Sequence, residues 1–278
     1  MPKTTLLIGA ALVILIGGTL LLQQRGALSP LFPSSATPPA ETQMRNAEAL
    51  ASPGRYTVTT STVNYFENAN GFLAKPAEPG EYPGVVMIHE NRGINDFVRQ
   101  MAEQLAKEGY IVLAVDLFGR SVETQEEARG LTSEYDQQKG IENMRAAAQY
   151  LRDQGATKIA SLGWCFGGGQ SMQLALSGEP MDATVIYYGQ LVTDSNQLRK
   201  ITWPVLGIFG DQDQVISVDS VNSFDKALDD LDITNEVYIY PGVGHAFANP
   251  SGMNYAPEQT QDAWDKTLTF LNKHLVTQ

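Results

Sequence analysis

Hydrophobic positions along the chain fall into two patterns, short strand-like runs and longer stripes at helical spacing. Short, nearly continuous apolar runs are typical of strands buried on both faces of a sheet. They occupy residues 84–88, 110–115, 159–162, 183–188, 205–209 and 236–240, after a β-rich run at 56–66. Between and after them, apolar residues recur every three or four positions in amphipathic stripes, at 97–105, 141–151, 221–228 and 264–275.

This alternation of strands and helices predicts crossover connections and a mostly parallel sheet flanked by helices. We therefore expect an α/β fold in which residues 55–278 form one domain. The active site of such a sheet is expected where the carboxyl ends of its strands meet.

The N-terminal region differs from this domain. Residues 6–22 are apolar except for Thr19, and a helix of that length spans about 25 Å against roughly 30 Å for a bilayer core. We interpret residues 1–25 as a signal anchor, with a cleaved signal peptide as the alternative. Residues 26–54 contain five prolines and are interpreted as a linker. This organisation predicts a periplasmic or cell-surface domain, attached to the membrane through its N-terminal segment.

Composition narrows the possible functions. The 278 residues include 19 Lys and Arg against 31 Asp and Glu, which gives a net charge of −12. An acidic chain lacks the positive field that supports nucleic-acid binding. One cysteine excludes an internal disulfide and a cysteine-rich zinc module, and the sequence indicates no metal or organic cofactor.

The single cysteine lies in a distinctive motif. Cys165 follows a strand-like run, is flanked by Gly163 and Gly167, and precedes a helical pattern. A Gly-x-Cys-x-Gly segment between strand and helix is typical of a nucleophile elbow with cysteine in place of serine. The flanking glycines would relieve collisions in the sharp turn, and the N–H of Phe166 would face a developing oxyanion. A structural cysteine in a glycine-rich turn is the alternative.

A nucleophile on such an elbow requires an acid and then a histidine later in the chain. His245 lies in a turn-rich loop after a strand, whereas the other two histidines precede the cysteine or lie on the last helix. The acid is expected after the 205–209 strand, where Asp211 and Asp213 compete. We favour Asp213, which would accept the His245 N–H and fix its tautomer, and interpret Asp211 as a turn former.

With these segments and the run His89-Glu90-Asn91-Arg92 after an early strand, the chain resembles the dienelactone hydrolase family of the α/β-hydrolase fold. The resemblance covers residues 55–275. It implies cysteine-dependent hydrolysis of an ester or lactone, typically an enol-lactone that bears a carboxylate.

The resemblance also implies roles for the early loop. The carboxylate of Glu90 would lie near the thiol and take its proton as substrate binds, and the N–H of Asn91 would be the second oxyanion donor. The alternative for Glu90 is a structural carboxylate paired with Arg92.

One position departs from the family pattern. The carboxylate-binding arginine four residues after the histidine is replaced by Asn249. Arg129 is a loose counterpart of a second family arginine, or else a solvated helix residue, and Arg92 is another candidate for contacting an anionic substrate. We therefore carry over the reaction class and leave the substrate open.

Three functions remain in competition. The first is an ester or lactone hydrolase with a Cys165–His245–Asp213 triad. A non-catalytic or redox-sensing extracytoplasmic binding protein on the same fold would instead contain an ordinary, slowly reacting thiol. A peptidase or acyltransferase on this fold is the third.

Overall fold

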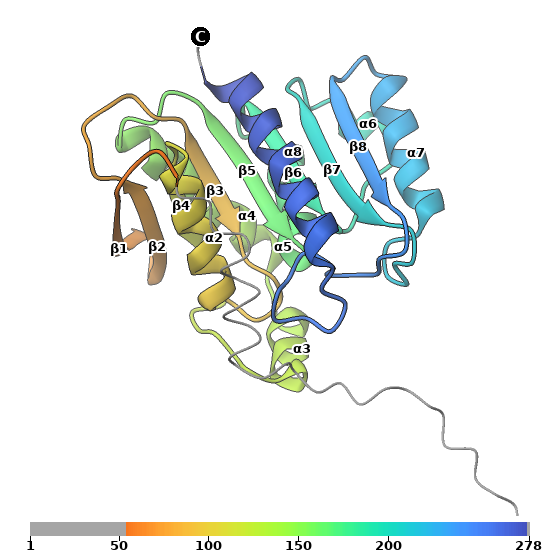
Figure 1. The fold of residues 1–278 in the computed structure, drawn as a ribbon, viewed down its shortest axis with the longest axis horizontal. Helices are drawn as coiled ribbons and strands as arrows, with labels where there is room; N and C mark the ends of the chain where they lie inside the picture. The colour runs from red at the N-terminus through yellow and green to blue at the C-terminus, as the bar shows by residue number, and fades with distance from the viewer. Residues whose placement is uncertain (1–53, 277–278) are drawn as a thin grey trace, which may run out of the picture. The chain divides into compact units, whose positions relative to one another are not determined.

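The computed structural model describes residues 54–276, which contain an eight-stranded sheet (Figure 1). The strand order is β1-β2-β4-β3-β5-β6-β7-β8, and the strands from β3 to β8 are parallel to one another. Strand β2 pairs antiparallel with both of its neighbours, β1 and β4. The strands are β1 (Val58–Phe66), β2 (Ala69–Pro76), β3 (Gly84–Ile88), β4 (Ile111–Val115), β5 (Ile159–Trp164), β6 (Ala183–Tyr187), β7 (Val205–Gly210) and β8 (Asn235–Tyr240). The predicted mostly parallel sheet is confirmed.

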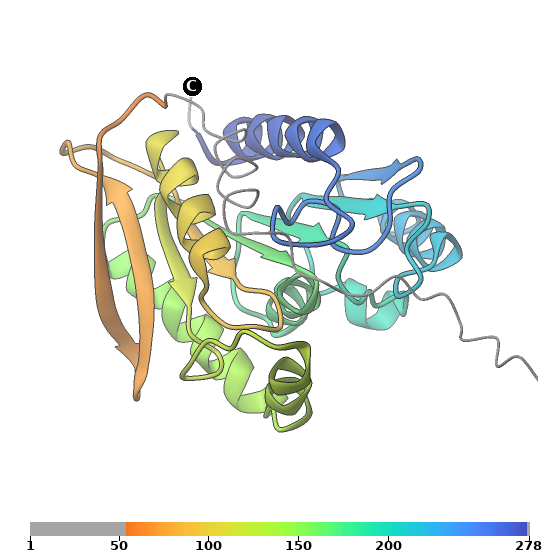
Figure 2. The same ribbon diagram turned by 60° about the horizontal axis from the view of Figure 1, so that its bottom comes forward.

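Helices cover both faces of the sheet, as the two views show (Figures 1 and 2). They are α2 (Asp96–Lys107), α3 (Gln125–Ser133), α4 (Gln137–Asp153), α5 (Phe166–Leu176), α6 (Ser195–Leu198), α7 (Val218–Asp229) and α8 (Pro257–Leu275). Helices α2 and α8 pack in one hydrophobic cluster, whereas α4, α5 and α7 pack in clusters on the opposite face. The core is therefore two apolar layers separated by the sheet.

The apolar patterns explain why these elements form. Every residue of β3, β4, β5 and β6 is buried, as expected for strands covered on both faces. The stripe Phe97, Met101 and Leu105 forms the buried face of α2. The hairpin strand β2 and the short helix α6 were not predicted, because short elements give little periodic signal.

The carboxyl ends of the parallel strands meet at one edge of the sheet, the lower edge in Figure 1, near α3 and the loop before α8. The proposed signal segment 1–25 and nearly all of the proposed linker 26–54 lie outside the described residues. Between residues 54 and 276, no helix is long and apolar enough to cross a membrane.

Candidate active site

The turn that carries Cys165 joins β5 directly to α5. Cys165 is the N-cap residue of α5 and has φ 54° and ψ −115°, which places a non-glycine residue in the left-handed half of backbone space. Such a conformation costs about 1–3 kcal/mol and is found mainly where the surrounding structure enforces it. Here the Cys165 N–H donates to the Tyr187 carbonyl at 3.0 Å, which ties the turn to the neighbouring strand.

The two flanking glycines allow three backbone segments to approach closely. A Cβ atom at Gly163 would lie 2.1 Å from the Gly167 carbonyl oxygen, and one at Gly167 would lie 2.3 Å from the Ile88 carbonyl oxygen. Any side chain at either position would collide with backbone, which cannot move aside. The steric purpose inferred for these glycines is therefore seen in the structure, and it brings the start of α5 against the end of β3.

Cys165, His245 and Asp213 form one connected row. The Nε2 atom of His245 lies 3.0 Å from the Cys165 sulfur, and the Nδ1–H donates to Asp213 Oδ2 at 2.8 Å. The other carboxylate oxygen, Oδ1, accepts the backbone N–H groups of Val215 at 2.7 Å and Ile216 at 2.9 Å. Asp213 is therefore held by three donors, which fixes the imidazole that it contacts.

Asp211 has a different partner. Its Oδ1 accepts the backbone N–H of Gly242 at 2.7 Å, which connects the β7 turn to the loop after β8. Of the two competing carboxylates, the structure places Asp213 against His245.

The charges in this row shift both ionisable partners. Burial would raise the pKa of Asp213, but the hydrogen bonds from His245, Ile216 and Val215 outweigh it and the pKa is lowered. Burial would lower the pKa of His245, but Asp213 and Cys165 raise it to about 10. The imidazole is thus stabilised in its protonated form as long as both neighbours are present.

Glu90 lies at the end of β3 and is 8% exposed. Its Oε2 accepts a short hydrogen bond from the Asn249 side-chain amide, whereas its Oε1 is buried with no hydrogen-bond partner among residues 54–276. Burial raises the pKa of Glu90 to about 7, opposed by the Asn249 hydrogen bond and by the charges of His245 and Arg92. The charge of Arg92 reaches this carboxylate, but no ion pair joins the two side chains in the described part of the chain.

The partners of Glu90 are themselves fixed. Asn249 Oδ1 accepts the Ser251 N–H at 2.8 Å, so its amide NH₂ group is left to face Glu90. His89 accepts the Leu117 N–H on Nε2 at 3.3 Å, so its Nδ1–H donates to the Glu90 carbonyl at 2.5 Å. Burial lowers the pKa of His89, which keeps this ring neutral in a structural position.

Two backbone N–H groups are available beside Cys165. Neither the N–H of Phe166 nor that of Asn91 donates to an acceptor within the described region. Both belong to segments that the close contact of Gly167 with the end of β3 brings together. They are the pair expected to form an oxyanion hole.

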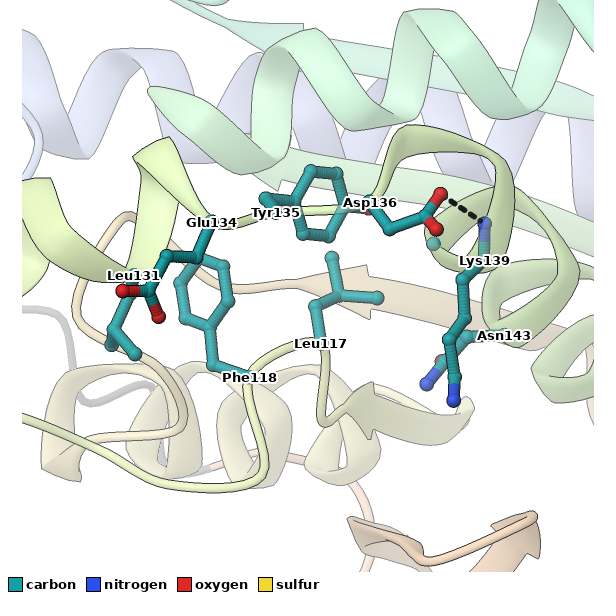
Figure 3. A pocket seen from close by; sticks show the side chains of 9 residues that line it. Leu117, Phe118, Leu131, Glu134, Tyr135, Asp136, Lys139 and Asn143 are labelled. Atoms are coloured by element: carbon teal, nitrogen blue, oxygen red, sulfur yellow. Dashed lines mark hydrogen bonds between the residues drawn. The ribbon is translucent and has the colours of Figure 1, made fainter.

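An aromatic cluster links the elbow to a cavity. The Phe166 ring packs against Phe118 and Tyr135, with centroid distances of 5.1 and 5.0 Å. A cavity of about 270 Å³ lies beside these rings, between the end of β4 and the helices α3 and α4 (Figure 3). Its lining includes the apolar or aromatic side chains of Phe118, Tyr135 and Leu131 and the charged side chains of Glu134, Asp136 and Lys139.

Arg129 does not line this cavity. It lies on α3, where its side chain is exposed, and no contact joins it to Cys165, His245 or Glu90 in the described residues. The structure therefore supports the solvated-helix alternative for this arginine.

Sequence reasoning missed two features of the site. The pairing of Asn249 with Glu90 crosses 159 positions of the chain, and no local pattern predicts it. Tyr188, which is fully buried with φ 35°, packs its ring against His245 at 5.3 Å. Its position directly after β6, at the same sheet edge as Cys165, was the available signal.

Comparison with known proteins identifies the family of the chain. The dienelactone hydrolase family model matches residues 69–275. A protein of Saccharolobus solfataricus named "Putative carboxymethylenebutenolidase" is 31% identical over 245 residues, covering 73% of this chain and 93% of the relative. A Bradyrhizobium protein named "Probable 2-oxo-3-(5-oxofuran-2-ylidene)propanoate lactonase" is 29% identical, covering 75% of this chain and 91% of its own length.

A solved structure has the same fold. The crystal structure titled "Putative Dienelactone Hydrolase" from Klebsiella pneumoniae superposes with a TM-score of 0.70 at 24% identity, over 78% of this chain and 98% of that one. The chain belongs to the dienelactone hydrolase family and is a lactone or ester hydrolase with the α/β-hydrolase fold.

Proposed function

We propose that the hydrolysis proceeds through a thioester on Cys165, with His245 and Asp213 completing a triad. The sulfur attacks the substrate carbonyl, while the N–H groups of Phe166 and Asn91 stabilise the oxyanion. When the carbon–oxygen bond breaks, His245 gives a proton to the leaving alcohol. Water then attacks the thioester, with His245 as the base. The observation that carries this proposal is the unbroken row from Cys165 through His245 to Asp213.

The pKa of His245 explains how one imidazole acts in both steps. Part of the rise to about 10 comes from Cys165 itself. Once the sulfur is acylated, it no longer interacts with His245 as a hydrogen-bonding or charged group, so the pKa of His245 falls. The imidazole is thus protonated when the leaving group needs a proton and becomes a base when water must be activated.

Glu90 is proposed to receive a proton during the same cycle. A carboxyl group with a pKa of about 7 holds or releases a proton with little free-energy change near neutrality. This agrees with the role that the family resemblance implies for Glu90, as acceptor of the thiol proton when substrate binds.

The substrate is proposed to be uncharged on the side that faces Glu90. Asn249 supplies a neutral amide at the position where the family has an arginine, and its NH₂ group is already bonded to Glu90. A substrate carboxylate placed here would face the Glu90 carboxylate without a cation between them. The repulsion between the two charges would weaken binding of such a substrate. Arg92 is the candidate for any anion contact, since its charge reaches Glu90.

The test of the triad is turnover of p-nitrophenyl acetate by the protein and by Cys165→Ala. We expect a loss of about a thousandfold or more, together with a mass increase of one acetyl group on the unmodified chain that is absent in the variant. Turnover that survives in Cys165→Ala would refute the assignment. Ser177→Ala, at the C-cap that follows α5, is a matched control and should leave the rate unchanged.

The location of the domain is a separate proposal that rests on residues 1–25 alone. Their apolar stretch supports export, with retention on the membrane. Fractionation should find the protein with the membrane and with its N-terminus intact, and recovery of a soluble form that starts beyond residue 25 would contradict retention.

A further inference from the structure

Two consecutive tyrosines at the end of β6 differ in how their hydroxyl groups are satisfied. The Tyr187 hydroxyl lies 2.6 Å from the Thr267 hydroxyl and donates to the Ala263 carbonyl at 3.0 Å. The Tyr188 hydroxyl is equally buried but has no hydrogen-bond partner among residues 54–276. Tyr187 therefore has an evident structural role in anchoring α8, and the hydroxyl of Tyr188 does not.

The surroundings of Tyr188 are the reacting groups themselves. Its ring packs edge-on against His245 at 5.3 Å and against Phe247 at 5.7 Å. Burial raises its pKa, the charges of Glu90 and Cys165 raise it further, and the Ala248 N–H opposes the rise. Since the Tyr188 O–H has no acceptor among residues 54–276, its proton remains available to donate to a ligand.

A second unpartnered polar atom lies in the same cluster. Glu90 Oε1 is buried without a hydrogen-bond partner in the described region, while Oε2 is bonded to Asn249. The charge of His245 also acts on Glu90. Buried polar atoms are nearly always paired, and those that are not commonly contact a ligand or water. A donor and an acceptor left unpaired around one histidine suit a small molecule that both donates and accepts.

We propose that the Tyr188 hydroxyl and Glu90 Oε1 bind and orient the water that hydrolyses the thioester. The inference rests on the proposed function, because it requires an acyl group on Cys165. The water would donate one hydrogen to His245 Nε2 and the other to Glu90 Oε1. One of its lone pairs would accept the Tyr188 O–H, which leaves the other directed at the thioester carbon.

The step balances with Glu90 ionised. The proton that Glu90 took from the thiol passes to bulk water before the thioester is attacked, and a proton returns from bulk water when the thiol forms again. The water oxygen forms a bond to the carbonyl carbon as its proton passes to His245 Nε2. The resulting tetrahedral intermediate then breaks its carbon–sulfur bond, the acid product leaves, and the proton on His245 is shared again with the Cys165 sulfur. Tyr188 keeps its proton throughout and acts only as a hydrogen-bond donor to the water.

The experiment separates acylation from deacylation by stopped-flow measurement of p-nitrophenol release from p-nitrophenyl acetate. In Tyr188→Phe we expect acylation within about threefold of the unmodified protein and deacylation slower by about tenfold or more, so that a burst of one product per active site becomes visible. Tyr187→Phe is the matched control, because it loses a hydroxyl that is bonded away from the site, and its deacylation should remain within about twofold.

Turnover in the presence of a stronger nucleophile than water distinguishes a water-binding role of Tyr188 from a purely structural one. Hydroxylamine attacks thioesters without needing a general base, so it should restore the turnover of Tyr188→Phe by a larger factor than that of the unmodified protein. Deacylation that is unchanged in Tyr188→Phe, or acylation and deacylation that slow equally, would overturn the water-binding role and leave the triad intact. A burst that is absent from all variants, with full turnover in Cys165→Ala, would instead refute the triad.

Discussion

Asp213 and Glu90 are two carboxylates at one site whose pKa values shift in opposite directions. Asp213 receives three hydrogen bonds, from one imidazole and two backbone N–H groups, and its pKa is lowered. Glu90 is as buried as Asp213, with 8% of the residue exposed against 7%, but it receives one hydrogen bond, from Asn249, and its pKa is raised to about 7. The number of hydrogen-bond donors, rather than residue type or exposure, therefore decides which carboxylate stays ionised.

The difference assigns each group a distinct chemistry. A carboxylate that stays charged orients a histidine and stabilises its protonated form. A carboxyl group that titrates near neutrality exchanges protons with its neighbours. The predictions below test this contrast from its largest expected consequence to its smallest.

The largest effect is expected from Asp213→Asn. The variant keeps the shape of the side chain but removes the charge that raises the pKa of His245, so kcat with p-nitrophenyl acetate should fall by about 10³–10⁴. Asp211→Asn is the matched control, since its carboxylate accepts the Gly242 N–H and makes no contact with His245 in the described part of the chain. A loss below tenfold in Asp213→Asn would remove Asp213 from the triad.

The second effect concerns stability. The unfolded chain releases the Glu90 proton near pH 4.5, whereas the folded chain keeps it until about pH 7. The free energy of unfolding therefore falls by about 3 kcal/mol across that window because of this group. Glu90→Gln should lack this loss. The free energy of unfolding of the variant, measured with urea, should therefore rise relative to that of the unmodified protein between pH 4.5 and 7, and the difference should then stay constant.

Asp213 should show the opposite dependence. Because its pKa is lowered in the fold, its contribution to stability is present at neutral pH and is lost as the pH falls through the folded pKa. Asp213→Asn should remove this acid-side loss. Parallel pH profiles for the unmodified protein, Glu90→Gln and Asp213→Asn would contradict the contrast.

The third effect is on the rate of Glu90→Gln. If the ionised Glu90 carboxylate takes the thiol proton, kcat/KM of the unmodified protein should rise with pH through about 7. Glu90→Gln should lose that inflection and be slower by about 10- to 100-fold above it. An inflection that survives unchanged would assign this titration to another group.

The smallest effect is expected from Asn249→Ala. The Asn249 side chain donates a hydrogen bond to Glu90 that lowers the Glu90 pKa. Removing this bond should raise that pKa and move the inflection in the pH profile of kcat/KM to higher pH by about one unit. The companion variant Asn249→Arg introduces a cation beside Glu90 and should move the inflection to lower pH. A shift of the same sign in both variants would show that Asn249 does not act through its hydrogen bond.

The sequence predicted the parts of the molecule that local patterns control. Continuous apolar runs identified the buried strands, and the spacing of Gly163, Cys165 and Gly167 identified the turn between β5 and α5. The order of acid and histidine led to Asp213 and His245, which the structure places together. Each of these features depends on residues close in the chain or on a known order of elements.

The remaining parts depend on contacts between distant loops. The contact of Asn249 with Glu90 arises only when the loop after β8 folds over the end of β3. The sequence also does not show that the Tyr188 hydroxyl lacks a hydrogen-bond partner among residues 54–276. The adjacent residue Tyr187 is the same amino acid, yet its hydroxyl is hydrogen-bonded. Predicting either one requires the three-dimensional arrangement of the sheet edge.

The meeting of strand ends at one edge has a consequence for folding. Glu90, Cys165, Tyr188, Asp213 and the His245 loop follow β3, β5, β6, β7 and β8 respectively. The proposed reacting groups therefore assemble only after the strands have paired, and a partly formed sheet would have the proposed nucleophile without its proposed base. Catalytic activity should thus act as a cooperative reporter of the complete sheet, disappearing in denaturant together with the last native strand pairs rather than in stages.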